Sequence, residues 1–89
     1  KPMNPFVKLR DKAGLSRQEL ADWLGVSVST VAQIERGIPS TLGPVVMAGL
    51  RTRGLNSSKL RQEYEAWRRS LVAVNTEAVQ QALSEVLAG

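Results

Sequence analysis

The apolar residues of this chain recur at helical spacing in a series of short segments, which glycine, proline and small polar residues separate. In the first segment, Asn4 and Pro5 are typical of a helix start, and apolar side chains follow at helical spacing as far as Gly14. Residues 42–50 are almost wholly apolar, which predicts a short buried helix. No segment alternates with the period of a β-strand. The sequence therefore predicts an all-α fold.

Two very short helical segments meet at a glycine in the stretch SRQELADWLGVSVSTVAQIERG. Ser16 and Glu19 have the spacing of a capping box, in which each side chain satisfies a backbone N–H at the start of the helix. Gly25 ends this first helix, because glycine adopts the left-handed conformation at little steric cost. Ser27 is the predicted cap of the second helix, which ends at Gly37. Helices this short are marginal in water, so we expect them to share one core with the preceding helix.

Two longer amphipathic helices are predicted in the C-terminal part of the chain. The first spans residues 57–72, and its apolar stripe is formed by Leu60, Tyr64, Trp67 and Leu71. The second begins at Asn75, with Val74 and Val79 as a hydrophobic staple, and its apolar face consists of Val79, Ala82, Leu83, Val86 and Leu87. We expect residues 55–89 to pack as an extension on a core formed by residues 1–54. The last helix either covers that core or joins two copies of the chain.

The charges are distributed unevenly along the 89 residues. The chain carries 12 Lys and Arg and 8 Asp and Glu, a net charge of +4. All the basic residues precede residue 70, so residues 1–69 carry +6 and residues 70–89 carry −2. A basic body indicates either a polyanionic partner such as nucleic acid or a solvated surface, and charge alone does not separate the two. No apolar run approaches the ~20 residues of a membrane span, and no signal-peptide pattern is present, so we expect a cytoplasmic protein with no membrane partner.

The residue types exclude most catalytic chemistry. The chain has no cysteine and no histidine, so it lacks thiol nucleophiles, disulfides, imidazole acid–base groups and the common zinc ligands. No clustered pair of carboxylates stands out either. We therefore expect no enzymatic activity, no metal site and no cofactor.

The phrase LADWLGVSVSTVAQIERG has the small, glycine and apolar positions of a helix-turn-helix motif. Ala21 is small enough for a second helix to cross closely, and Gly25 makes the turn between the helices. Through this motif at residues 16–37, the chain resembles the lambda-repressor-like family, also called the Cro/CI or XRE family. The resemblance extends over residues 5–54. The resemblance implies a compact bundle of about five helices, whose second motif helix enters the major groove of double-stranded DNA. It further implies a sequence-specific transcriptional regulator, and we expect a dimeric repressor of prokaryotic or phage type.

The resemblance also suggests which residues contact DNA. If Val31 and Ile34 face the core, the opposite face of that helix points outward, and we expect base contacts from Val28, Ser29, Ala32 and Gln33. Gln33 has the amide geometry that pairs with adenine, whereas an apolar side chain can contact a thymine methyl group. Ser29 and Thr30 suit either a base edge or a phosphate. We expect phosphate contacts from Arg17, Ser27, Thr30, Arg36, Ser40 and Thr41.

Three further expectations concern packing and partners. By resemblance, Arg10 and Glu35 form a structural ion pair, and the alternative is two unrelated surface charges. Trp23 is expected to be covered by Trp67 or Leu71, and the alternative is an exposed aromatic ring at a subunit contact. The rival to a DNA-binding function is an antitoxin-like or regulatory protein-interaction module, in which residues 55–89 bind a protein partner.

Overall fold

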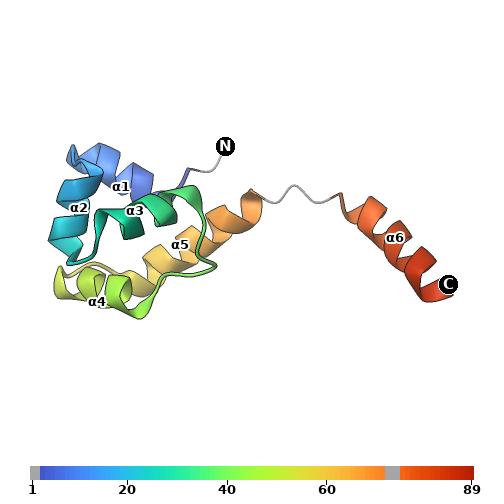
Figure 1. The fold of residues 1–89 in the computed structure, drawn as a ribbon. Helices are drawn as coiled ribbons and strands as arrows, with labels where there is room; N and C mark the ends of the chain where they lie inside the picture. Colours follow the sequence, from blue (N-terminus) through green and yellow to red (C-terminus); the bar gives the residue numbers. More distant parts are fainter. Residues whose placement is uncertain (1–2, 72–74) are drawn as a thin grey trace.

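The computed structural model describes residues 3–71 and 75–89. In these residues all regular structure is helical, which confirms the predicted all-α class. Helices α1 to α5 form a bundle, and α6 lies apart from it (Figure 1). The helices are α1 (Pro5–Ala13), α2 (Arg17–Leu24), α3 (Val28–Arg36), α4 (Pro44–Thr52), α5 (Ser57–Ser70) and α6 (Thr76–Ala88).

The ends of the first three helices are fixed by local capping interactions. Oδ1 of Asn4 accepts the N–H of Phe6 at 2.8 Å, and Ser16 and Glu19 make both hydrogen bonds of the predicted capping box. Gly25 ends α2 with φ of +76°, a conformation that favours glycine. The predicted end of the fifth helix at Val72 and the predicted staple residue Val74 lie outside the described residues.

One hydrophobic core joins α1 to α5. Tyr64 of α5 is fully buried, and its ring meets that of Phe6 edge to face, with 6.4 Å between the ring centroids. Because Tyr64 lies in this core, α5 is an integral part of the bundle. The other buried apolar residues are Leu20, Ala21, Leu24, Val31, Ile34, Leu42, Val46, Met47 and Leu50.

The short buried helix predicted over residues 42–50 is α4, which spans Pro44–Thr52 and is buried on one side only. It begins at Pro44, which suits the first helical position because proline lacks the N–H that would be unpaired there. Only one side of α4 faces the core, and Val45 is 62 % exposed on the other side. Gly49 explains how α4 approaches α2, because a Cβ atom at this position would overlap the carbonyl oxygen of Leu24. Glycine therefore permits a close crossing of the two helices.

The prediction that Trp67 or Leu71 packs over Trp23 is wrong. Trp67 and Leu71 both lie against Gly37, where an added Cβ would be 3.0 Å from Trp67 and 3.3 Å from Leu71. The guanidinium of Arg53 instead lies 5.1 Å from the centroid of the Trp23 ring, and Arg53 Nε donates to the Trp23 carbonyl at 3.0 Å. The last turns of α5 meet the end of α3, whereas Trp23 lies near the end of α2 beside α4. The two tryptophans therefore pack in different parts of the bundle.

Helix α6 buries none of its residues. Every residue from 75 to 89 is exposed, including those of the predicted apolar face. Of the two helices expected to extend the core, α5 thus packs on it and α6 does not. Within residues 3–71 and 75–89, no helix combines the length and the apolar character that a membrane crossing requires.

Candidate nucleic-acid interface

The C-terminal end of α3 is anchored to α1 by one buried side chain. Asn4 is 4 % exposed, and its Nδ2 donates to the carbonyl oxygens of Ile34 at 3.0 Å and Glu35 at 3.2 Å. The last carbonyls of a helix lack the usual partner four residues on. Here the Ile34 carbonyl accepts the Gly37 N–H at 3.0 Å as well as the Asn4 amide. Asn4 therefore caps the start of α1 and the end of α3 at the same time.

Helix α5 holds the segment that follows α3. The Tyr64 hydroxyl donates to the Pro39 carbonyl at 2.6 Å, and Arg68 Nε donates to the Gly37 carbonyl at 2.9 Å. Trp67 lies between these two residues along α5 and packs against Gly37. Burial raises the pKa of Tyr64, so its hydroxyl stays protonated as a donor. Together with Asn4, these contacts fix the orientation of α3 in the bundle.

A nearly buried carboxylate joins the first three helices. The Glu35 side chain is 3 % exposed, and it accepts Arg10 Nε at 2.9 Å and Arg10 Nη2 at 3.2 Å. Arg17 Nε donates to the same carboxylate at 2.9 Å. Burial acts to raise the pKa of Glu35, but the hydrogen bonds from both arginines outweigh it and lower the pKa. Arg10 and Glu35 are thus an ion pair of the bundle, and Arg17 is a second cation on it, which sequence reasoning did not anticipate.

The outward face of α3 carries the residues expected to contact bases. Val31 and Ile34 are 0 % and 2 % exposed, so the opposite face of the helix points to solvent. Ser29 and Gln33 are exposed there, Val28 is 39 % exposed, and Ala32 is half-buried. This face carries no charge before Arg36, which is exposed at the end of the helix.

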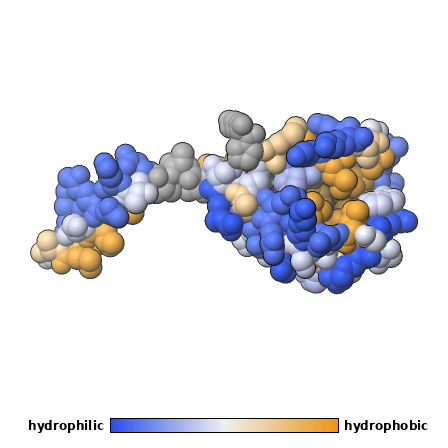
Figure 2. All heavy atoms as spheres, turned by 180° about the vertical axis from the view of Figure 1, so that it is seen from behind, coloured by the Kyte–Doolittle hydropathy of each residue, from blue (hydrophilic) through white to orange (hydrophobic). Residues whose placement is uncertain are grey.

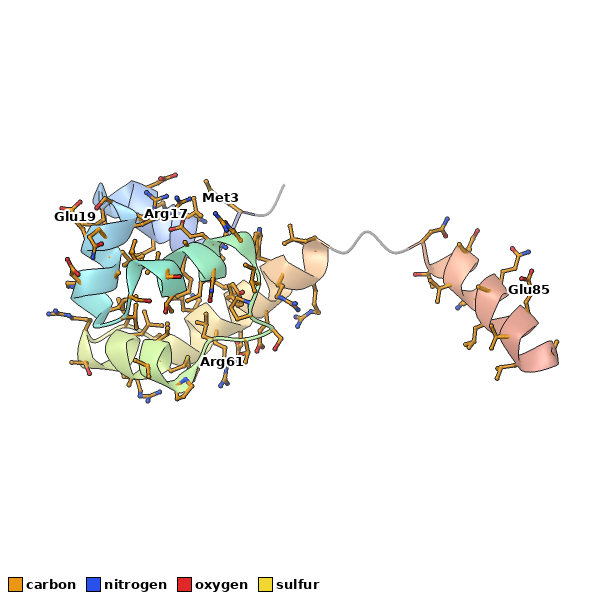
Figure 3. The ribbon with its side chains drawn as sticks, in the orientation of Figure 1. Met3, Arg17, Glu19, Arg61 and Glu85 are labelled. Carbon is orange, nitrogen blue, oxygen red and sulfur yellow. The ribbon has the colours of Figure 1, made fainter. Side chains whose placement is uncertain are left out.

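The residues expected to contact phosphates are spread over three elements. Ser27 and Thr30 both belong to the N-terminal cap of α3, where Ser27 Oγ accepts the Thr30 N–H at 3.1 Å and lies 2.9 Å from Thr30 Oγ1. Ser40 and Thr41 are exposed in the segment between α3 and α4. Arg17 lies at the start of α2, on the side facing α1 and α3 (Figure 3). It is 54 % exposed although one of its nitrogens is bound to Glu35.

Two short helices at a glycine turn, with the second one anchored and its polar face open, make a helix-turn-helix unit. A family model described as Helix-turn-helix matches residues 7–47, from α1 into α4. These residues are a lambda-repressor-like helix-turn-helix domain. The match supports a DNA-binding regulator with a helix-turn-helix domain, in which α3 is the second helix of the motif. Neither a search of curated proteins nor a search of solved structures finds a match to this chain.

A groove of about 400 Å³ lies beside α3 of this helix-turn-helix domain. Ser27, Thr30 and Gln33 line one side, and Pro39 and Val45 are among the residues of the other side. Sequence reasoning missed Val45, because an apolar residue inside an apolar run is assigned to the core. The signal that could have revealed it is its place one residue after Pro44, in the first turn of a helix that faces the core on only one side.

The described residues offer no metal site to this domain. Among them, no three acidic side chains converge as ligands would, and the chain has no histidine or cysteine. The chemistry of the site is therefore that of hydrogen bonds, apolar contacts and arginine cations.

Proposed function

We propose that this chain is a sequence-specific repressor of prokaryotic or phage type, which binds double-stranded DNA as two copies and blocks a promoter. The observation that carries the proposal is the outward face of α3, which combines one amide, one hydroxyl and small apolar groups on a helix anchored at its end. An inert solvated face would carry charged side chains instead. A regulator of this kind acts in the cytoplasm, where its DNA is.

The base contacts are assigned by chemistry. The Gln33 amide can donate and accept in one plane, which suits N6 and N7 of adenine. Val28 and Ala32 are apolar and short, which suits the thymine methyl group, and the Ser29 hydroxyl suits either a base edge or a phosphate. Each good base contact of this kind is worth about 1–3 kcal/mol of discrimination. Contacts from these four positions account for recognition of a short half-site.

The phosphate contacts set the position of α3 on the duplex. Arg17 and Arg36 stand as exposed cations at the start of α2 and at the end of α3. Ser27 is exposed and Thr30 is half-buried in the N-terminal turn of α3, where the helix dipole and the backbone N–H groups of the first turn favour an anion. Ser40 and Thr41, in the segment that follows α3, provide neutral hydroxyl donors to phosphates.

Two copies are needed for useful affinity. One recognition helix covers only a few base pairs, and related domains double their contacts by placing two copies on half-sites about one helical turn apart. A repressor with this mechanism needs no catalytic group, because it acts by occupying the DNA.

Selection from a pool of randomised duplexes at ~150 mM salt tests the proposal, because nonspecific attraction is substantially screened there. We expect enrichment of a two-fold-symmetric motif with half-sites about 10 base pairs apart. A Gln33→Ala chain carried through the same selection is the control, and it should lose preference at one position of each half-site. Failure of the unmodified chain to enrich any sequence would contradict the proposal.

A second candidate function is a protein-interaction module, and the exposed α6 is the observation that favours it. The apolar stripe of α5 does not support a protein-interaction module, because most of it is not exposed. Its Tyr64 is fully buried, Leu60 and Trp67 pack against the core, and only Leu71, at 52 % exposed, is open. The same selection separates the two functions, because a module that uses the bundle only as a scaffold would enrich no DNA sequence.

A further inference from the structure

Helix α6 presents an apolar stripe that nothing in the bundle covers. Val79 and Leu83 are 50 % and 54 % exposed, and Val86 and Leu87 are 73 % and 77 % exposed. At 100° per residue these side chains fall on one side of the helix together with Ala82. Figure 2 shows the result as one hydrophobic and one hydrophilic side of α6.

A helix of this kind needs a partner to be stable. It has 13 residues, which is near the length below which isolated helices are marginal in water. Packing of an apolar face normally supplies the missing stability, yet no residue of α6 is buried within the chain. The exposed stripe is therefore the surface through which α6 gains stability on association.

The charges of α6 identify the kind of partner. Its ionisable residues are Glu77 and Glu85, and it contains no lysine or arginine, so a polyanion or an anionic membrane is a poor partner. Both carboxylates lie away from the apolar stripe at helical spacing, as does the intervening Gln81. Figure 3 labels Glu85 on α6. The stripe is thus free of charge, and two copies of it can face each other without opposing like charges.

We propose that α6 pairs in antiparallel orientation with α6 of a second copy of this chain. In one register, Val79 lies opposite Val86 of the second copy, and Ala82 lies opposite Leu83 of the second copy, so apolar residues meet along the stripe. The dipoles of two antiparallel helices attract each other, which favours this orientation over a parallel pair.

This inference rests on the proposed function for its biological purpose, since two DNA-binding bundles need a link. Its test needs no DNA. The chain is studied by sedimentation equilibrium from micromolar to millimolar concentration, together with Leu83→Glu and Gln81→Glu. Both variants add one carboxylate to α6, but only Leu83→Glu adds it to the stripe. We expect reversible dimers for the unmodified chain and for Gln81→Glu, and at least about tenfold weaker dimerisation for Leu83→Glu, because each dimer loses two buried leucines.

Cysteine pairs test the orientation, since the natural chain has no cysteine. A Val79→Cys chain mixed with a Val86→Cys chain and oxidised mildly should form mixed disulfides between the two. Each chain alone should form far fewer, because opposite positions must come within about 7 Å between Cα atoms. Efficient disulfides between two Val79→Cys chains would overturn the antiparallel register.

The failures of the two proposals are distinguishable. A chain that stays monomeric at every concentration, or a Leu83→Glu chain that dimerises like Gln81→Glu, overturns the role of α6 whatever the DNA selection shows. A dimer that enriches no DNA sequence overturns the proposed repressor function and leaves the pairing of α6 intact.

Discussion

Arg17 donates its Nε to Oε1 of Glu35 at 2.9 Å, so a cation at the start of α2 is bound to the end of α3. Glu35 is already neutralised by Arg10, which binds both of its oxygens. The charge of Arg17 is therefore surplus, and its side chain is 54 % exposed. Because a guanidinium has five N–H donors in a fixed plane, one edge can stay on a carboxylate while another binds a phosphate. In the phosphate contact proposed for Arg17, the ion pair with Glu35 would hold one edge of the guanidinium and leave the other edge for the DNA backbone.

Lysine at position 17 should not replace arginine. A lysine ammonium is a point charge that cannot hold both anions in this fixed geometry. We expect Arg17→Lys to lose most of the nonspecific DNA affinity that Arg17→Ala loses, and Arg17→Ala should lower the salt dependence by about one phosphate contact. Arg36→Lys is the matched control, because Arg36 is exposed with no hydrogen bond among the described residues. The DNA affinity of each variant is measured by fluorescence anisotropy over a series of salt concentrations. Unchanged DNA binding by Arg17→Lys would contradict a role of Arg17 in bridging Glu35 and a phosphate.

The depressed pKa of Glu35 predicts a specific loss of stability in acid. Its ordinary pKa of 4.5 applies to the unfolded chain, and the folded value is lower because of the two arginines. The carboxylate therefore stabilises the fold above pH 4.5, and this contribution is lost as the pH falls through the folded pKa. The free energy of unfolding, measured in urea between pH 7 and pH 2, should fall more steeply for the unmodified chain than for Glu35→Gln. Parallel curves would show that Glu35 titrates alike in both states.

Asn4 offers a test of the contact between α1 and α3. Asn4→Asp keeps an oxygen to accept the Phe6 N–H but loses the donor to the end of α3, whereas Asn4→Ala loses both. Because the Glu35 carbonyl would lose a donor and a buried carboxylate would face two carbonyl oxygens, we expect Asn4→Asp to be destabilised by about 1–3 kcal/mol or more, at least as much as Asn4→Ala. Thermal unfolding followed by circular dichroism measures both. An Asn4→Asp chain as stable as the original would leave only the capping role.

The sequence pattern predicted interactions that form within one turn of helix, and the family resemblance implied the Arg10–Glu35 ion pair between α1 and α3. Other contacts that depend on how the helices cross were missed. The Ser16 and Glu19 capping box is a local pattern, so three residues of spacing suffice to predict it. The neighbours of Trp23 depend on the path of α5, which periodicity does not define. The link from Arg17 to Glu35 spans 18 residues and forms only because α2 and α3 meet at a fixed angle. The roles of Val28 and Gln33 toward bases stay predictions.

Gly49 lies where α4 crosses α2, and we expect its substitution by alanine to destabilise the fold. Alanine normally stabilises a helix interior by up to about 1 kcal/mol relative to glycine. At Gly49, however, the added Cβ would overlap the carbonyl oxygen of Leu24 and force α2 and α4 apart. We expect Gly49→Ala to lower the free energy of unfolding by about 1–3 kcal/mol, as overpacked cores do. Gly43→Ala, where nothing lies within 4 Å of the added Cβ, is the control without a steric overlap. It should cost only the few tenths to about 1 kcal/mol by which alanine is worse than glycine at an N-cap.

Gln33 decides whether the outward face of α3 contacts bases. Gln33→Ala should weaken binding to the selected DNA sequence by about 1–3 kcal/mol, because a bidentate contact to adenine is lost. Binding to unrelated duplexes should hardly change, since phosphate contacts are kept. Gln62→Ala removes an exposed glutamine from α5 and should leave both affinities unchanged. The two affinities are measured by titration of labelled duplexes at one salt concentration. An equal loss on both duplexes would assign Gln33 to the DNA backbone, and no loss on either would remove it from the interface.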